Sequence, residues 1–223
     1  MSVHFVVDFD GTITREDATD LLLERFAAPA WLDIERAWVT GRIGSRECLA
    51  RQVALLTASP AELDGAIDEL KVDAGFGTFV TAAREIDASV EIISDGLDRS
   101  IDRTLSRLKV KVPRKANRLV QAGATSWRLE FPNADSGCRA GSGVCKCVAA
   151  RHIRPVILIG DGRSDFCLAE EASFVFAKGK LRGHCEREGI PYRAFETFAE
   201  VTAAMPSLVP QIAADMRKIF LPE

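Results

Sequence analysis

The sequence contains no long run of apolar residues. Its longest apolar stretches, such as VILIG at residues 156–160, are far too short to cross a bilayer, so we expect no contact with a membrane. The residues before Asp8 include no basic segment followed by an apolar one, a pattern that predicts no signal peptide. Both absences favour a cytoplasmic protein.

Dense clusters of lysine and arginine are also missing. The net charge of the 223 residues is −3 and the isoelectric point is near 5.7, so nucleic acid is not an expected partner. The patterns G-x-x-x-x-G-K-[ST] and G-x-G-x-x-G do not occur, which leaves nucleotide-dependent chemistry without support. A serine hydrolase is disfavoured because there is no G-x-S-x-G and only His4, His152 and His184 could act as a base.

Cysteines at the paired spacing of a zinc site are absent as well. The chain has six cysteines, which in a cytoplasmic protein are most simply reduced thiols. Cys138, Cys145 and Cys147 lie close together, but C-x6-C-x-C lacks the C-x-x-C pairs of a zinc site. We interpret them as structural or incidental thiols in preference to metal ligands, and a redox role stays open. The remaining cysteines are Cys48, Cys167 and Cys185.

What the sequence does contain is a short apolar strand followed by two acids. Residues 3–7 (VHFVV) are typical of a buried β-strand, and Asp8, Asp10 and Gly11 follow directly. Side chains at positions i and i+2 of an extended segment point to the same side, so the two carboxylates should lie together. Such a pair indicates a metal site, a proton donor or both, because like charges raise each other's pKa unless a cation lies between them. The apolar strand counts against the alternative, a D-x-D surface turn.

Strands alternate with helices along the rest of the chain. Apolar segments at residues 90–93, 156–159 and 174–177 predict buried strands, and residues 118–121 and 125–131 predict a β-hairpin. Ser45 and Ser164 are expected to cap helices, the second of which carries Asp165 in its first turn. Apolar periodicity predicts helices at residues 17–27, 29–38, 45–56, 59–70, 76–86, 97–108, 144–152, 181–188, 198–205 and 208–219.

This alternation is typical of a doubly wound, mainly parallel α/β sheet of the Rossmann-like kind. In such sheets, ligands bind beyond the carboxyl ends of the strands. Asp8, Ser94 and Asp161 each follow a predicted strand directly. We therefore expect three distant parts of the chain to converge on one crevice.

Four motifs then occur in a characteristic order. They are DFDGT at residues 8–12, IISDG at residues 92–96, CK at residues 145–146 and GDGRSD at residues 160–165. Together they resemble the motifs of the haloacid dehalogenase superfamily of phosphohydrolases. The resemblance implies a Mg²⁺-dependent hydrolase that cleaves the phosphomonoester of a small metabolite through an aspartyl-phosphate intermediate.

The same resemblance implies a role for each acid of the first motif. Asp8 would attack phosphorus, and Asp10 would act as general acid and then as general base. Mg²⁺ would be held by Asp8, Asp161 and Asp10, the last through its backbone carbonyl. Hard oxygen ligands of this kind suit Mg²⁺.

The remaining motifs imply phosphate-binding residues. Ser94 and Lys146 would hold the phosphoryl oxygens and offset their charge in the transition state. Asp165 would orient the metal-bound waters or Lys146. Further phosphate-binding positions implied by the motifs are Thr12, Asp95 and Gly96.

The helical segment after the first motif is similar to the cap of the phosphoserine-phosphatase branch of the superfamily. This implies a core of residues 1–14 and 76–223, with a β-hairpin flap at about residues 109–132, and an inserted helical cap at residues 15–75. Within that branch, DFDGTIT, the hairpin, and GDGRSD followed by VFAKG and EGIPY give a closer likeness to two groups. These are the enol-phosphate phosphatases of methionine salvage and the phosphocholine/phosphoethanolamine phosphatases.

Three cap residues are candidates for substrate binding. Phosphoserine phosphatases grip the amino acid with a Glu after the first motif and an Arg in a later cap helix. The nearest positions here are Asp17 and Gln52, and the missing arginine counts against phosphoserine. Arg46 could compensate, with an exposed helix charge as the alternative interpretation.

Two other functions stay open. A phosphotransferase or phosphomutase of the same superfamily would use the same Asp8 and differ in the acceptor. A phosphate- or metal-binding regulatory module without turnover belongs to a different class, and the acid/base residue Asp10 counts against it. The sequence predicts neither the substrate nor the oligomeric state.

Overall fold

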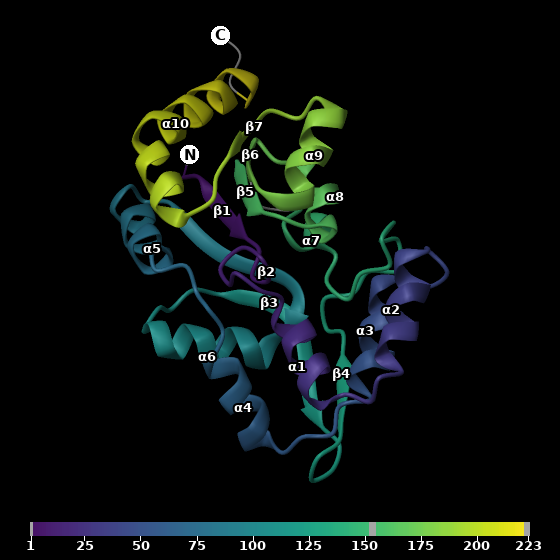
Figure 1. Ribbon diagram of the computed structural model, residues 1–223. Coiled ribbons are helices and arrows are strands. Elements are labelled where there is room, and N and C mark those ends of the chain that lie inside the picture. The colour runs from purple at the N-terminus through teal and green to yellow at the C-terminus, as the bar shows by residue number, and fades with distance from the viewer. Residues whose placement is uncertain (1, 152–154, 221–223) are drawn as a thin grey trace.

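The computed structural model describes residues 2–151 and 155–220. Within these residues, seven strands form one sheet in the order β4-β3-β2-β1-β5-β6-β7, and all neighbours are parallel except β3 and β4 (Figure 1). The predicted doubly wound, mainly parallel α/β fold is confirmed. The strands are β1 His4–Val7, β2 Ser89–Leu97, β3 Arg114–Gln121, β4 Trp127–Glu130, β5 Val156–Gly160, β6 Phe174–Ala177 and β7 Tyr192–Ala194.

The register of the central strands positions the polar residues that follow them. β1 and β5 are buried along their whole length, as expected for apolar strands that are covered on both faces. Val7 pairs with Ile92 of β2 on one side and with Ile159 of β5 on the other. The chain therefore leaves these three strands at one edge of the sheet, where Asp8 follows Val7.

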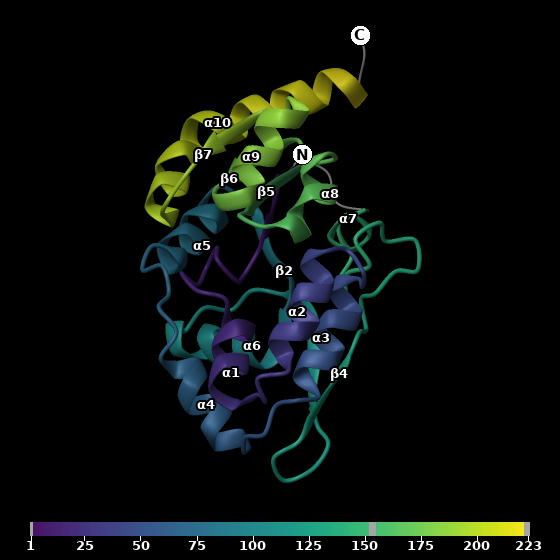
Figure 2. The same cartoon turned by 45° about the vertical axis from the view of Figure 1, so that its right-hand side comes forward.

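Helices cover both faces of the sheet. Phe5 and Val7 point into one apolar cluster, beneath α5 (Phe76–Glu85), α6 (Asp98–Leu108) and α10 (Phe198–Phe220). Val6 points into a second cluster with residues of α8 (Phe166–Ala169) and α9 (Gly179–Glu188), which lie on the opposite side in Figures 1 and 2. The alternation of β1 side chains between two covered faces explains why this strand is apolar throughout.

Besides α5, four helices lie between β1 and β2. They are α1 Ala18–Phe26, α2 Trp31–Val39, α3 Ser45–Val53 and α4 Pro60–Asp68, and α4 begins with a capping box between Ser59 and Glu62. The β3–β4 hairpin packs on this group, since Trp127 Nε1 donates to the Ala58 carbonyl at 2.8 Å. The hairpin is thus attached to the segment between α3 and α4. The division of the chain into a core and a cap stays a prediction.

Three strands differ from the prediction. β2 does not end at Ile93 but continues to Leu97, because pairing with β3 resumes at Leu97 and Asn117 after a shift in register. β3 starts at Arg114, where it pairs in parallel with Ile92 before it enters the hairpin. The strand β7 was not predicted, since three residues are too short to show a pattern.

Two helices also differ. One continuous helix, α10, replaces the two predicted at residues 198–205 and 208–219, although it contains Pro206 and Pro210. Each proline lacks the N–H for one intrahelical hydrogen bond, and the helix nevertheless continues past both. The helix predicted at residues 144–152 is α7, Lys146–Ala149, and its predicted end at His152 lies outside the described residues. Among the helices that the structure describes, none has the length and apolar character needed to span a membrane.

Candidate active site

The carboxylate of Asp8 lies at the end of β1 and is almost completely buried. The backbone N–H of Asp8 donates to the Ile159 carbonyl at 2.9 Å, which continues the pairing with β5 by one residue. Asp8 Oδ1 accepts the N–H of Phe9 at 2.7 Å. Asp8 Oδ2 lies 2.8 Å from Lys146 Nζ. Contacts with both carboxylate oxygens therefore fix the side chain of Asp8.

The acids that follow β5 meet Asp8 at this edge. Asp8, Asp161 and Asp165 each offer a carboxylate oxygen, and these oxygens all lie within 4.8 Å of one another. Thr12 Oγ1 donates to Asp161 Oδ1 at 3.0 Å. Gly11 has a φ of +68°, and a Cβ at this position would overlap Asp161 Oδ2. The glycine of the first motif thus allows the loop after β1 to approach Asp161 closely.

Lys146 joins the acids from the start of α7, and its side chain is completely buried. Its Nζ atom lies 2.6 Å from Asp165 Oδ1 as well as 2.8 Å from Asp8 Oδ2. Burial alone would lower the pKa of Lys146, but the two carboxylates outweigh this effect and raise it. Asp165 is fixed further by the N–H groups of Asp161 and Gly162, each 3.1 Å from its Oδ2 atom.

The charges of this cluster suit a divalent cation. Burial, with Asp8 adding to the effect, raises the pKa of Asp161 to about 6 and that of Asp165 to about 7. Lys146 lowers both pKa values, but burial and the neighbouring carboxylates outweigh it, so a further positive charge would stabilise the ionised acids. Oxygen atoms from three acids within 4.8 Å are the hard ligands that Mg²⁺ prefers. The residues present therefore fit this metal.

Asp10 lies beside the cluster and faces the start of α1. Its Oδ1 atom accepts the N–H of Ala18, the first residue of α1, at 2.8 Å. Burial raises the pKa of Asp10 well above 3.8, and the neighbouring carboxylates, Asp17 first among them, add to the rise. A carboxyl group with a raised pKa in this position can keep a proton and donate it.

The second motif lies against Asp10. Ser94 is buried, and its Oγ atom accepts the N–H of Gly96 at 3.0 Å. A Cβ at Gly96 would overlap Asp10 Oδ2 and would lie 3.1 Å from Ser94 Oγ. The structure therefore brings Asp10, Ser94 and Gly96 together, and glycine is the residue that leaves room for Asp10.

Asp95 has a different environment from its two neighbours. Its carboxylate accepts hydrogen bonds from Ser45 Oγ at 2.8 Å, Asn117 Nδ2 at 3.1 Å and the Val144 N–H at 2.9 Å. These bonds connect α3, β3 and the loop before α7. They occupy the side chain, so a phosphate contact at this position would have to come from the backbone.

The predicted cap residues lie at different distances from the cluster. Asp17 caps α1 by accepting the N–H groups of Thr19 and Asp20, and it is close enough to raise the pKa of Asp10. Gln52 is buried and donates to Glu35 Oε2 at 2.9 Å, which is a contact between α3 and α2. Arg46 is exposed, and its backbone N–H donates to the Gly141 carbonyl at 2.8 Å. Of these three residues, Asp17 is thus the one whose charge affects the pKa of Asp10 directly.

Sequence reasoning missed two roles of serine. Ser164 Oγ lies 3.4 Å from Asp8 Oδ2, whereas the sequence suggested only a helix cap, and the N-cap of the 3-10 helix η1 (Arg163–Asp165) is Gly162. Ser45 is not the N-cap of α3 either, since that residue is Gly44 and the Ser45 hydroxyl binds Asp95. Ser164 lies inside the GDGRSD motif, so the sequence could have indicated that it belongs to the site. Ser45 lies in no motif, so the sequence did not indicate its bond to Asp95.

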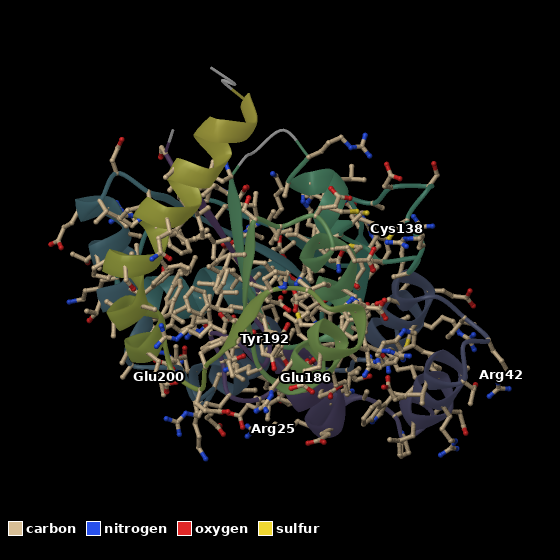
Figure 3. All side chains as sticks on the ribbon, turned by 90° about the horizontal axis from the view of Figure 1, so that it is seen from above. Arg25, Arg42, Cys138, Glu186, Tyr192 and Glu200 are labelled. Carbon is tan, nitrogen blue, oxygen red and sulfur yellow. The ribbon has the colours of Figure 1, made fainter. Side chains whose placement is uncertain are left out.

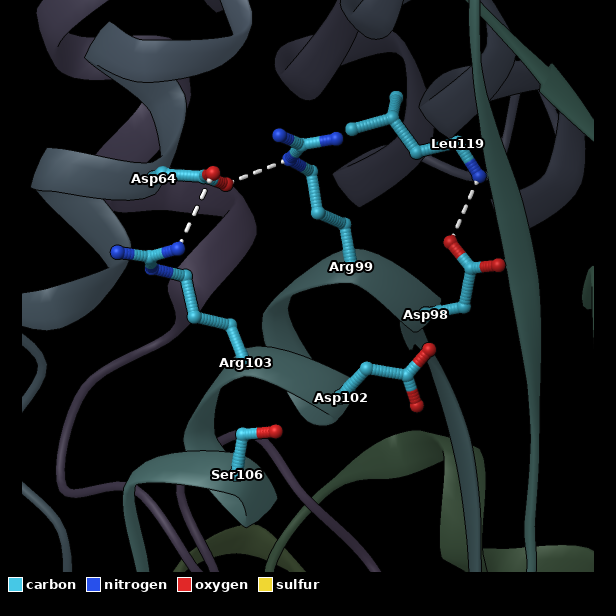
Figure 4. A pocket seen from close by; sticks show the side chains of 7 residues that line it. All are labelled: Asp64, Asp98, Arg99, Asp102, Arg103, Ser106 and Leu119. Carbon is cyan, nitrogen blue, oxygen red and sulfur yellow. Dashed lines mark hydrogen bonds and ion pairs between the residues drawn. The ribbon is translucent and has the colours of Figure 1, made fainter.

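Two hollows on the surface differ in their relation to the acids. One of about 480 Å³ adjoins Asp161, Thr12 and Lys178. The other, of about 410 Å³, lies between α4 and α6 (Figure 4). Its guanidinium groups are paired, since Arg99 and Arg103 lie 2.7 and 3.1 Å from Asp64. The first hollow is therefore the better candidate for access to the cluster.

Solved structures share this fold at low sequence identity. A HAD family hydrolase of Salmonella enterica serovar Typhi aligns with a TM-score of 0.68 and 20% identity, over 91% of this chain and 69% of that one. The phosphoserine phosphatase of T. onnurineus aligns with a TM-score of 0.68 and 15% identity, over 93% of this chain and 96% of that one. These similarities support the fold.

Relatives of known name are similar over nearly the whole chain. The 2-hydroxy-3-keto-5-methylthiopentenyl-1-phosphate phosphatase of Exiguobacterium sp. is 32% identical over 212 residues, which are 92% of this chain and 98% of the relative. The phosphatase of the same name from Geobacillus kaustophilus is 31% identical over 208 residues, or 89% and 93%. Residues 5–170 match the family of haloacid dehalogenase-like hydrolases. The chain therefore belongs to the haloacid dehalogenase-like hydrolase family.

Proposed function

We propose that the protein is a Mg²⁺-dependent phosphatase that hydrolyses a small phosphorylated metabolite through an aspartyl-phosphate on Asp8. The observation that carries this proposal is the meeting of Asp8, Asp161 and Asp165 with the buried ammonium of Lys146 at one edge of the sheet. Three acids and one lysine beside the carboxyl ends of β1 and β5 suit an anionic substrate bound with a cation.

The metal would be held by the carboxylates of Asp8 and Asp161 and by the backbone carbonyl of Asp10. When bound, Mg²⁺ would neutralise the repulsion between the carboxylates and the phosphoryl oxygens. Asp165 accepts three hydrogen bonds, from Lys146 and two backbone N–H groups, and we assign it the positioning of Lys146.

In the first chemical step, an oxygen of Asp8 attacks phosphorus and the bond to the leaving alkoxide breaks. A carboxylate needs no base for this attack. Lys146 and Ser94 hold the phosphoryl oxygens and stabilise the charge that develops on them. Asp10 donates its proton to the alkoxide, a role that its raised pKa supports.

In the second step, Asp10 removes a proton from water, which attacks the phosphorus of the aspartyl-phosphate. The bond between Asp8 and phosphorus breaks and inorganic phosphate leaves. A positioned acid and base of this kind contributes about 10²–10⁴-fold to the rate. The bond from the Ala18 N–H to Asp10 Oδ1 fixes the orientation of the carboxyl group for both steps.

The substrate is proposed from the relatives. Two proteins that are 31–32% identical to this chain are named for 2-hydroxy-3-keto-5-methylthiopentenyl-1-phosphate, and we propose this enol phosphate or a close analogue as the first candidate. Gln52 binds Glu35 inside the cap, which leaves no arginine at this position for a phosphoserine carboxylate. Phosphocholine, phosphoethanolamine and phosphoserine are the alternatives.

The experiment that tests the function is a substrate screen. Purified protein with Mg²⁺ is assayed for phosphate release from these four metabolites and p-nitrophenyl phosphate, and the substrates are ranked by kcat/KM. We expect phosphate release from every substrate that enters the site, and we expect the enol phosphate to have the highest kcat/KM. Assays with added alcohols as acceptors would detect a phosphotransferase, and no release from any substrate would favour a binding module.

Two organisational proposals accompany the function. Residues 15–75 form a cap over a core of residues 1–14 and 76–223, with contacts such as Ser45 to Asp95 between the two parts. The protein works in the cytoplasm, an inference supported by the six cysteines, all of which are free thiols.

A further inference from the structure

Four of the six cysteines lie together beside the active site, although they come from two distant segments. Cys138 belongs to the loop before α7, Cys145 and Cys147 belong to the start of α7, and Cys167 belongs to α8. Cys145 Sγ lies 3.4 Å from Cys147 Sγ. The thiol of Cys138 interacts with that of Cys145, and the thiol of Cys147 interacts with that of Cys167. The four sulfur atoms thus form a connected group.

We propose that Cys138, Cys145, Cys147 and Cys167 form a binding site for one structural Zn²⁺ ion. Zn²⁺ binds four thiolates at about 2.3 Å in a tetrahedron, which places neighbouring sulfur atoms about 3.8 Å apart. The central pair, Cys145 and Cys147, is already at a comparable separation. Among the described residues, no three of these sulfur atoms lie within 4.8 Å of one another. Metal binding would therefore draw Cys138 and Cys167 inward.

Backbone N–H groups already face two of these sulfur atoms. The N–H groups of Ala140 and Ser142 donate to Cys138, and the N–H group of Val148 donates to Cys145. A neutral thiol is a weak acceptor, whereas a thiolate gains a charge-assisted hydrogen bond from each donor. The turn after Cys138 is thus built to stabilise a thiolate of the kind that binds a metal.

A cation lies next to the proposed site. The guanidinium group of Arg139 interacts electrostatically with Cys147 and Cys167, and it is held at 2.7 Å by Glu170, next to the end of α8. Four thiolates with one Zn²⁺ ion carry a net charge of −2, so a nearby arginine would offset part of this charge. Arg139 follows Cys138 directly, so its ion pair with Glu170 joins the loop to the end of α8.

The loop that contains Cys138 is held by polar contacts, among them Arg139 to Glu170 and the Arg46 N–H to the Gly141 carbonyl. Residues 131–145 form neither a helix nor a strand, and most side chains before Ser142 are partly or fully exposed. Figure 3 labels Cys138 at the periphery of the molecule, on the side of α2 and α3. Loops of this length without secondary structure are uncommon in compact domains and are often functional. A metal shared with α7 and α8 would cross-link this loop, and it would fix the backbone on both sides of Lys146.

A disulfide explains the arrangement less well. A bond between Cys145 and Cys147 would close a small ring across the first turn of α7, and it would leave Cys138 and Cys167 without a role. Among divalent ions, Zn²⁺ is the one that four thiolates select in structural sites. The sequence spacing did not indicate such a site because its fourth ligand, Cys167, follows the next strand.

The test uses the full chain and two measurements. The zinc content of the purified protein is determined by mass spectrometry, and the zinc is then exchanged for Co²⁺, whose absorption reports its ligands. We expect one Zn²⁺ per chain, and a Co²⁺ spectrum with intense thiolate charge-transfer bands and the visible bands of a tetrahedral site. Cys138→Ser and Cys167→Ser should each weaken Co²⁺ binding at least about tenfold.

The matched controls are Cys48→Ser in the cap and Cys185→Ser in α9, both of which should retain the Co²⁺ spectrum of the unmodified chain. The site is refuted if the unmodified chain binds no zinc and gives no thiolate bands with Co²⁺. Unchanged Co²⁺ binding in both Cys138→Ser and Cys167→Ser would refute it as well, as would a Cys145–Cys147 disulfide in the native protein. None of these outcomes depends on phosphatase activity, and the spectrum of the unmodified chain decides the matter even if a variant fails to fold.

Discussion

Lys146 Nζ lies 2.6 Å from Asp165 Oδ1, and neither side chain has any exposed surface. Two ionisable groups without access to water depend on each other, because a buried charge that loses its partner keeps its full cost of desolvation. Lys146 also reaches Asp8, so the same ammonium group serves the fold and the chemistry. Asp165 is held independently by two backbone N–H groups, which fixes the position of the pair.

Replacing Lys146 should therefore damage both stability and turnover. In Lys146→Met, we expect the free energy of unfolding to fall by about 3–5 kcal/mol, because Asp8 and Asp165 lose their common partner. We expect kcat to fall at least about 10²-fold, because a donor to the phosphoryl oxygens is removed. Urea unfolding and steady-state kinetics measure the two effects. Lys115→Met is the matched control, since Lys115 is partly exposed and pairs with Glu91 at 3.2 Å outside the cluster.

Replacing Asp10 should separate proton transfer from metal binding. In Asp10→Asn, we expect kcat to fall about 10²–10⁴-fold, because the amide can neither protonate the leaving group nor accept a proton from water. Mg²⁺ affinity should be retained, because the proposed contact of Asp10 with the metal is through its backbone. Kinetics together with a Mg²⁺ titration measure both quantities. Turnover equal to that of the unmodified protein would remove Asp10 from its role.

A methyl group at position 96 should act through Asp10. In Gly96→Ala, the new Cβ would overlap Asp10 Oδ2, so we expect the carboxyl group to be displaced and kcat to fall at least about tenfold. Gly65→Ala in α4 is the control, because a Cβ there has no heavy atom within 4 Å and alanine favours a helix. The control should keep full activity and gain up to about 1 kcal/mol of stability. Full activity in Gly96→Ala would show that the position of Asp10 tolerates this displacement.

The pKa of Asp161 predicts how stability depends on pH in EDTA. Burial, with Asp8 adding to the effect, raises this pKa from 3.8 to about 6. Between these values the folded state binds more protons than the unfolded state, so the contribution of Asp161 to the free energy of unfolding falls as the pH rises. As the pH rises from 3.8 to about 6, the unmodified protein should therefore lose stability relative to Asp161→Asn.

Urea unfolding of both proteins in EDTA across this pH range measures the difference. Added Mg²⁺ favours the ionised carboxylate, so it should stabilise the unmodified protein more than Asp161→Asn at neutral pH. Parallel pH profiles for the two proteins would contradict the raised pKa.

The sequence predicts the parts of the fold that depend on local pattern. The apolar run before Asp8 identified β1, and the same reasoning found β5 and the exit of Asp161 from it. Because parallel strands place their carboxyl ends at one edge, the meeting of Asp8 with Asp161 could be predicted without coordinates. The roles of these residues stay predictions until variants are measured.

The features that the sequence did not predict depend on long-range contacts. The extension of β2 to Leu97 follows from its pairing with β3, which no local pattern shows. The bond from Ser45 to Asp95 joins residues 50 positions apart, and neither residue signals its partner. Cys167 likewise joins Cys147 only once β5 and α8 are in place. Local patterns thus found the elements, and the contacts between elements required the structure.

The most direct test of the proposed chemistry compares Asp8→Asn with the unmodified protein. Phosphate release from p-nitrophenyl phosphate is measured for both proteins, each in Mg²⁺ and in EDTA, and circular dichroism confirms that both are folded. We expect release from the unmodified protein in Mg²⁺ alone, because attack requires both the Asp8 carboxylate and the metal. Undiminished release in EDTA, or from Asp8→Asn in Mg²⁺, would contradict a metal-dependent attack by Asp8.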